Sequence, residues 1–320
     1  MFASHLAMHI PDGFLSVPVS LFGWALAIGL IAIALGQTKK VLGERQVPLM
    51  GILAAFIFAA QMINFPVAGG TSGHLIGGML AAILLGPWGA VLVMTSVVAL
   101  QALLFQDGGL LVLGFNIFNM GIVSAFVGYG VYSLLGKVTG HSRAGNLFNA
   151  AVGAWMSVEA AAVAVTLQLV VSGTSPLSVA FPAMVGVHAL IGFGEALITV
   201  GALAFIQQAR PDLVGRPNQM AKRGAGWIAV GLIIALVIVG FSPLADPNPD
   251  GLERVAEDQG FIDTAQGPSY EILPDYTVPF IEDSALTTIA AGVIGVLIVA
   301  GVGYGVGRLN RRSNQQMEQV

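Results

Sequence analysis

Long apolar runs alternate with short polar segments along most of the chain. A bilayer-spanning helix needs about 20 predominantly apolar residues, and most of these runs reach or approach that length. One run is short, and Gly86-Pro87 predicts a tight turn between it and the next run. The pattern predicts an all-α polytopic membrane protein with nine spans, at 17–35, 48–67, 75–86, 87–105, 110–136, 147–172, 181–208, 225–243 and 285–307.

The composition agrees with this class. Of the 320 residues, 56% are hydrophobic and 9% are charged, whereas soluble domains carry about 25% charged residues. There is no cysteine, which excludes disulfides, thiolate ligands and cysteine nucleophiles, so a metal ion would have to bind nitrogen or oxygen. The Gly-x-x-x-x-Gly-Lys-Ser/Thr motif is also missing, so ATP hydrolysis by that route would belong to another chain. The lipid bilayer is the expected environment, and no nucleic-acid partner is expected.

The basic residues predict the orientation. With the N-terminus outside, Arg254 is the one residue of the 13 Lys and Arg that falls outside. This positive-inside bias predicts an N-out, C-in topology with an odd number of spans. The basic residues expected inside are Lys39, Lys40, Arg45, Lys137, Arg143, Arg210, Arg216, Lys222, Arg223, Arg308, Arg311 and Arg312.

A basic linker at 210–224 divides the chain. We expect a seven-helix transmembrane domain at 8–209, a two-span unit at 225–310, and an inner tail at 311–320. The outer segment of the two-span unit, 244–284, carries ten acidic residues against Arg254 alone. These carboxylates either concentrate cations near the outer face by electrostatic focusing or are simply solvated.

The segment from Met8 to Ser16 holds the most specific chemistry. Residues 1–7 have neither a basic region nor an apolar region, so they do not resemble a signal peptide, and we expect a leader or a misassigned start. If the chain begins at Met8, the Met8 α-amine, the His9 main-chain nitrogen and the His9 imidazole form a tridentate chelate. Planar nitrogen sets suit Ni(II) and Cu(II) better than Mg, Ca or tetrahedral Zn.

His74 is the candidate for a fourth ligand. It ends Gly69-Gly70-Thr71-Ser72-Gly73-His74, a predicted outer loop whose glycines let the backbone approach a bound ion. The loop and the N-terminal segment share the predicted outer face, so contact between His9 and His74 is topologically allowed. A loop histidine by itself is also compatible with a structural or solvated role.

Three ionisable residues fall inside predicted spans: Glu159, His188 and Glu195. Such residues are functional candidates because burying a charge in lipid is costly. They would either support the ligands or accept protons, as a secondary transporter driven by protons would require, or form a buried network that locks helices together. The further polar residues expected near them are Asn64, Ser72, Gln101, Asn116 and Asn119.

Two other patterns leave alternatives open. Gly51, Ala55 and Ala59 recur every four residues and predict close helix contact, either with a partner or within this chain. Gly70-Thr71-Ser72-Gly73 fits the Gly-x-Ser-Gly pattern of rhomboid intramembrane serine proteases, with His188 as the histidine that such an enzyme needs. No glycine spacing of the rhomboid kind surrounds His188.

Three separated motifs occur in a common order: Met8 to Leu15, the Gly-Gly-Thr-Ser-Gly-His74 loop, and Gly186-Val187-His188 through Gly194-Glu195-Ala196. Together they resemble the substrate-capture membrane subunits of energy-coupling-factor cobalt and nickel transporters (the CbiM/NikM type), over about residues 8–208. Pro249-Asp250-Gly251-Leu252-Glu253 begins a stretch that resembles a second component (the PDGLE/NikN type), which is separate in some members and fused in others.

The resemblance implies that Met8, His9 and His74 coordinate a transported Ni(II) or Co(II) ion, with no permanently bound cofactor and no catalytic residue. It further implies a transmembrane coupling subunit and paired cytoplasmic ATPases as partners, in the inner membrane of a prokaryotic cell. In the family the chelating methionine is the first residue, whereas here it is the eighth.

Overall fold

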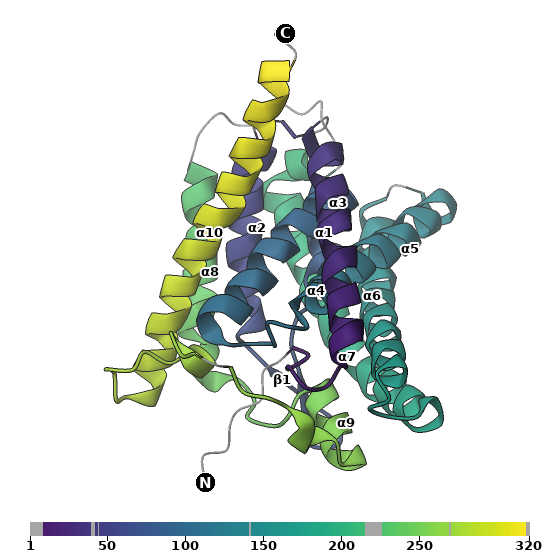
Figure 1. Ribbon diagram of the computed structural model, residues 1–320. Helices are drawn as coiled ribbons and strands as arrows, with labels where there is room; N and C mark the ends of the chain where they lie inside the picture. The colour runs from purple at the N-terminus through teal and green to yellow at the C-terminus, as the bar shows by residue number, and fades with distance from the viewer. Residues whose placement is uncertain are drawn as a thin grey trace.

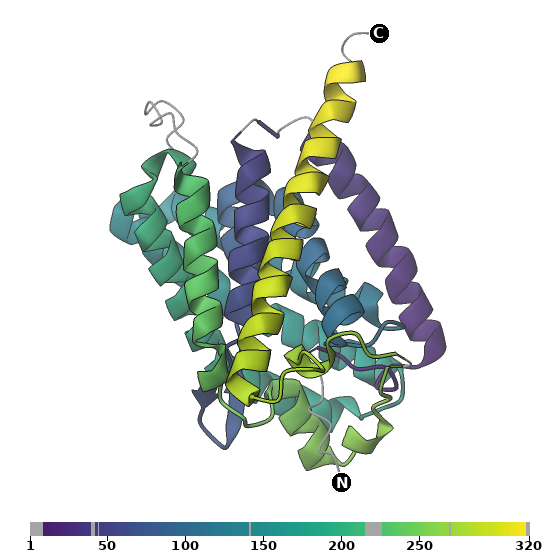
Figure 2. The same cartoon turned by 90° about the vertical axis from the view of Figure 1, so that its left-hand side faces the viewer.

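Hydropathy determines most of the architecture. The computed structural model describes residues 9–39, 42–43, 45–140, 142–214, 226–268 and 270–317, of which 312–317 by backbone alone. Seven helical stretches in this part are long and apolar enough to cross a bilayer. In Figures 1 and 2 the long helices lie side by side as one bundle. An all-α membrane protein is thus confirmed, while nine spans and the N-out orientation stay predictions.

The elements follow one another in this order. The helices are α1 Val17–Lys39, α2 Gln46–Gln61, α3 Gly78–Leu100 with a π-helical continuation Gln101–Phe105, α4 Leu113–Ile117 with the π-helical Phe118–Val123, α5 Ser124–Thr139, α6 Arg143–Val171, α7 Leu177–Ala209, α8 Gly226–Gly240, α9 Gly251–Gln259 and α10 Ser284–Met317. The strands β1 Phe65–Val67 and β2 Thr71–Gly73 form an antiparallel hairpin.

Helix α2 lies at the centre of the bundle. Twelve of its 16 residues are buried, and α10 packs along it over most of its length. Gly51 permits this approach, because a side chain there would meet the main chain of Ala300 and the side chain of Tyr304. The small-residue pattern that includes Gly51 is therefore used within this chain.

Helix α3 reverses direction at Gly86. A straight helix over Gly78–Phe105 would be roughly 42 Å long, yet residues at both ends contact His9. The rings of His9 and His74 are 5.8 Å apart, and Asp107 lies 2.6 Å from the His9 ring. The reversal is made by Gly86, whose φ of 75° and ψ of 162° are open to glycine alone. A turn at Gly86-Pro87 was predicted from the sequence.

Several predicted boundaries were wrong. The second span, expected to reach residue 67, ends at Gln61, because the chain turns into the β1–β2 hairpin. The third was expected from 75, but its helix begins at Gly78. The last helix, predicted as a span over 285–307, continues to Met317, and the boundary at 310 between the two-span unit and the tail stays a prediction.

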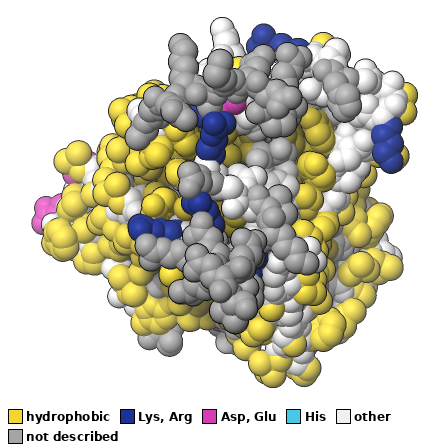
Figure 3. Space-filling model, turned by 90° about the horizontal axis from the view of Figure 1, so that it is seen from above, with side chains coloured by type: hydrophobic (Ala, Val, Ile, Leu, Met, Phe, Trp, Pro, Cys, Tyr) yellow, Lys and Arg dark blue, Asp and Glu magenta, His cyan; other side chains and the backbone are white. Residues whose placement is uncertain are grey.

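The two ends of the bundle differ in chemistry. The N-terminal segment, the β-hairpin and the chain between α8 and α10 lie at the end opposite the C-terminus (Figures 1 and 2). Lys and Arg side chains gather on the face at the C-terminal end (Figure 3). The predicted orientation depends on this uneven distribution of basic residues between the two ends.

The segment between α8 and α10 lies across the N-terminal segment. The Gln266 amide donates a 2.7 Å hydrogen bond to the carbonyl of Asp12, and Phe14 packs edge-on against Phe261 with ring centroids 5.0 Å apart. Asp250 caps α9 by accepting hydrogen bonds from the amides of Leu252 and Glu253, both at 2.8 Å. This acidic segment is therefore packed onto the rest of the molecule.

We expect Gly86→Ala to lower the free energy of unfolding by about 1–3 kcal/mol, because alanine is strained in that backbone region. Nothing lies within 4 Å of the side chain that would be added, so the loss of stability would come from backbone strain and not from a steric clash. Thermal unfolding in detergent measures it. The matched control is Gly130→Ala, which also enters open space but in a regular helix. Equal melting temperatures for the two variants would contradict the assignment of the reversal to Gly86.

Candidate functional site

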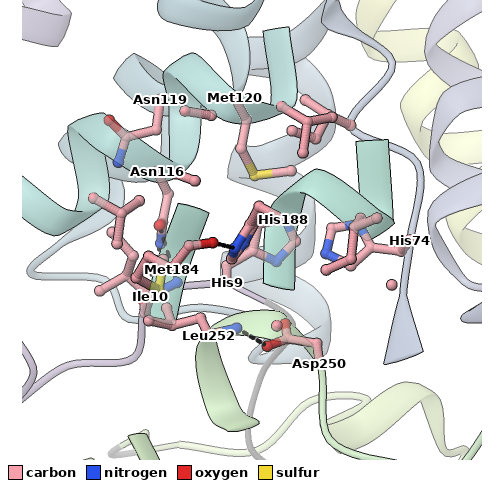
Figure 4. A pocket seen from close by; sticks show the side chains of 18 residues that line it. His9, Ile10, His74, Asn116, Asn119, Met120, Met184, His188, Asp250 and Leu252 are labelled. Carbon is pink, nitrogen blue, oxygen red and sulfur yellow. Dashed lines mark hydrogen bonds between the residues drawn. The ribbon is translucent and has the colours of Figure 1, made fainter. Parts of the chain in front are cut away.

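The end of the bundle that holds the N-terminal segment contains a cavity of about 90 Å³. It is lined by the N-terminal segment, the loop after β2, α4 with the π-helical segment that follows it, helices α6 and α7, and the start of α9. Figure 4 shows His9, His74, His188 and Asp250 around it. The cavity thus gathers imidazole and carboxylate groups from four segments that are far apart in the sequence.

The imidazole of His9 is held by a carboxylate. Its Nδ1 donates to Asp107 Oδ1 over 2.6 Å, and both residues are 4% exposed. The hydroxyl of Tyr276 donates to Asp107 Oδ2, also over 2.6 Å. Burial alone would raise the pKa of Asp107, but the His9 imidazole and the Tyr276 hydroxyl outweigh it, so the pKa is lowered. Among the described residues, the buried His9 Nε2 has no hydrogen-bond partner.

The backbone next to His9 is clamped. The Ile10 amide donates to Asn116 Oδ1 over 3.1 Å, and Asn116 Nδ2 donates back to the Ile10 carbonyl over 3.0 Å. The Gly109 amide donates to the same carbonyl. Gly108, with φ of 93°, leaves the space that the His9 side chain occupies. These contacts fix where the main chain enters the cavity.

His74 follows β2 and is held from α7. Its Nδ1–H donates to the Leu75 carbonyl at 3.0 Å, which leaves the ring lone pair on Nε2. Glu195, fully buried in α7, accepts hydrogen bonds from the amides of Ile76 at 2.6 Å and Gly77 at 3.0 Å. This carboxylate therefore anchors the backbone two residues after His74.

The hairpin is also tied to the chain just before α9. The amide of Ser72 donates to the Pro249 carbonyl over 2.8 Å, and its hydroxyl donates to the Asn248 carbonyl over 2.7 Å. Asn64 Nδ2 donates to Ser72 Oγ at 3.2 Å. Ser72 and Asn64 thus connect the His74 loop to the C-terminal region.

Asp250 and His188 complete the cavity wall. Asp250 is 5% exposed, and burial raises its pKa although the nearby His74 opposes the shift. Burial and then the charge of Asp250 raise the pKa of Glu253 to about 9. His188 donates from Nδ1 to the Met184 carbonyl at 2.7 Å, and Gly251 gives its ring room.

Of the residues singled out from the sequence, His9 and His74 are brought together. His188 lies at the same cavity, whereas Glu195 and Ser72 hold the backbone beside it and Asn64 donates to the Ser72 hydroxyl. Glu159 is buried in α6 outside the lining, and its Oε1 has no partner among the described residues. Met8 lies outside the described residues. Within them, no three His, Asp or Glu side chains are close enough to hold a metal ion.

Sequence analysis missed Asp107, Tyr276 and Asp250. Asp107 is a single acidic residue between apolar runs, and nothing nearby in the sequence pairs it with His9. Asp250 carried a usable signal, since Asp followed by Glu three residues later is a capping box that starts a helix.

The comparisons with known proteins concern both parts of the chain. Residues 9–213 match a family described as the cobalt uptake substrate-specific transmembrane region, CbiM, and 225–312 match the PDGLE domain. A putative fused nickel transport protein NikMN of Archaeoglobus fulgidus is 37% identical over 311 residues, covering 95% of this chain and 99% of that protein. A cobalt transport protein CbiM of Sorangium cellulosum is 34% identical, covering 65% and 95%.

A fused nickel transport protein NikMN of Rhodobacter capsulatus is 29% identical, over 96% of this chain and 100% of that one. Among solved structures, a truncated transition metal transporter superposes with a TM-score of 0.56 at 35% identity, covering 62% of this chain and 98% of the other. The relatives named above are therefore transport proteins.

We expect Glu195→Ala to destabilise the protein, because it strands two buried amides that each cost about 1–3 kcal/mol when unpaired. Glu195→Gln keeps one acceptor oxygen for these amides but replaces the other oxygen with an NH2 donor. We therefore expect its stability to lie between that of the wild type and that of Glu195→Ala. Thermal unfolding in detergent tests the order. A Glu195→Gln variant as stable as the wild type would contradict this role.

Proposed function

The chain belongs to the family of cobalt-uptake substrate-specific transmembrane regions and carries a PDGLE domain, and from this we propose that it captures Ni(II) or Co(II) at the extracytoplasmic face. It is a multi-pass membrane protein of a family that takes up metal ions. The ion is its cargo, and delivery inward uses ATP hydrolysed by other chains. The observation that carries the proposal is the meeting of His9 and His74 at one cavity.

The proposed ligands are the Met8 amine, the main-chain nitrogen and imidazole of His9, and the imidazole of His74. Four nitrogen donors favour Ni(II) and Co(II) over Mg and Ca, which prefer oxygen. Support comes from the clamped backbone at Ile10 and the Glu195 anchor, because a rigid donor set selects by geometry.

His9 changes its partners when the ion binds. Of the two ring nitrogens, Nδ1 is the one close enough to the His9 main-chain nitrogen for both to bind one ion. In the structure Nδ1 faces Asp107. Turning the ring about Cβ–Cγ releases Nδ1 to the ion and brings Nε2 to the Asp107 side. The carboxylate then holds the ring from behind, the arrangement common around metal-bound histidines.

The remaining polar residues support this set. His188 faces the ion across the cavity, and Glu195, Asn64 and Ser72 position the His74 loop. Glu159 lies outside the cavity lining, in the buried interior of the seven-helix domain at 8–209.

The proposed partners are a transmembrane coupling subunit and paired cytoplasmic ATPases. They meet the basic face at the end of the bundle opposite the cavity, which the positive-inside bias assigns to the cytoplasm (Figure 3). The unit at 225–310 belongs to the same transporter, because it packs onto the N-terminal segment that supplies the ligands.

We expect His74→Ala to weaken Ni(II) and Co(II) binding by more than about 100-fold, beyond what supporting residues cause. His188→Ala, at the same cavity, is expected to cost less. Titration calorimetry on folded, purified protein measures both. Wild-type affinity in His74→Ala, or a larger loss in His188→Ala, would overturn the ligand assignment.

The proposed amine ligand predicts that protein starting at Met8 binds Ni(II) tightly with one ion per chain, whereas protein starting at Met1 binds more weakly. The reason is that Met8 in the longer chain has an amide in place of a free amine. Titrating both forms side by side tests this. Equal affinity would remove the Met8 amine from the ligand set.

A further inference from the structure

We propose that Tyr276, in the PDGLE-matching region, is a positioning residue of the capture site that acts through Asp107 on His9. The inference rests on the proposed function. A specific side chain of the C-terminal region thereby contributes to metal binding by the cobalt-uptake transmembrane region.

Three buried groups form one chain of hydrogen bonds. The Tyr276 hydroxyl donates to Asp107 Oδ2, and Asp107 Oδ1 accepts from the His9 ring, each over 2.6 Å. Tyr276 is 8% exposed. The side-chain amide of Gln101 donates to the Tyr276 oxygen over 3.3 Å, which orients the hydroxyl proton toward Asp107.

The Tyr276 ring is fixed independently of its hydroxyl. It stacks on Phe105, with centroids 4.6 Å apart and ring planes 14° from parallel. Its backbone and that of Asp275 have positive φ, at 56° and 48°, a region that side chains other than glycine seldom adopt. Such conformations persist where the surroundings enforce them and they cluster at functional sites. Gln106, which precedes Asp107, also has a positive φ, at 56°.

The direction of the effect follows from charge. An imidazole that binds a cation becomes a stronger N–H donor, so a charged carboxylate behind it stabilises the loaded site more than the empty one. Oδ2 of Asp107 is buried, and the Tyr276 hydroxyl is the donor that keeps it satisfied. Removing that hydroxyl leaves a buried carboxylate oxygen without this donor, so the carboxylate holds the His9 ring less firmly.

The decisive variant is Tyr276→Phe, which preserves the stacked ring and deletes the hydroxyl. We expect its dissociation constant for Ni(II) to rise about 10-fold, the lower end of the range for residues behind metal ligands. Tyr270→Phe is the matched control, since its hydroxyl lies in the same outer segment and donates to the Leu103 carbonyl at 2.9 Å. That control is expected to bind as the wild type does.

A double-mutant cycle distinguishes positioning from loop stability. Asp107→Asn should weaken binding by about 10- to 100-fold, and adding Tyr276→Phe to it should change little, because the hydroxyl acts through the carboxylate. The ligand-field spectrum of bound Ni(II) is recorded for each variant and should shift with Tyr276→Phe. Additive losses, or a Tyr276→Phe protein with wild-type affinity and spectrum, would overturn the inference. A wild type that binds no Ni(II) or Co(II) would instead refute the proposed function.

Discussion

The contact between the His9 imidazole and the Asp107 carboxylate holds the candidate site together. Both groups are almost completely buried, and a buried charge is tolerated only where it is paired and hydrogen-bonded. Satisfying Asp107 requires the N-terminal segment on one oxygen and the C-terminal region on the other. Since Asp107 follows a helix that reverses at Gly86, this one pair fixes how three parts of the chain meet. Breaking it by removing one partner costs about 3–5 kcal/mol in typical buried pairs.

Sequence reasoning predicted the helices because the bilayer imposes their length. The sequence predicts a first span from residue 17, and α1 begins at Val17. The turn at Gly86-Pro87 follows from residues that cannot continue a helix. Prediction failed where an apolar run leaves the helix, as at Phe65-Pro66-Val67, which looks like the end of a span and is an edge of a hairpin. Asn64 and Pro66 were the available signals there.

The site was predictable only in part, for a related reason. His9 and His74 could be paired because a topology argument put both on one face. Asp107 and Tyr276 could not, because each is a single polar residue whose partner lies roughly 100 to 170 positions away in the chain. The acidic segment shows the same limit: its net charge is visible in the sequence, yet Asp250 is buried at the cavity while the Asp258 side chain is 57% exposed. Position within the fold decides which carboxylate contributes.

The shortage of side-chain donors bears on selectivity. Two imidazoles converge, and no third His, Asp or Glu side chain among the described residues comes close enough to complete a site. Under the proposed function the remaining donors are an amine and a main-chain nitrogen. Main-chain nitrogen is a poor ligand for Mg and Ca, and planar nitrogen sets do not suit tetrahedral Zn. Such a site discriminates between metal ions by the kind of donor atom it offers. The contacts that clamp Ile10, anchor Ile76 and orient His9 matter because main-chain donor atoms cannot be repositioned by a flexible side chain.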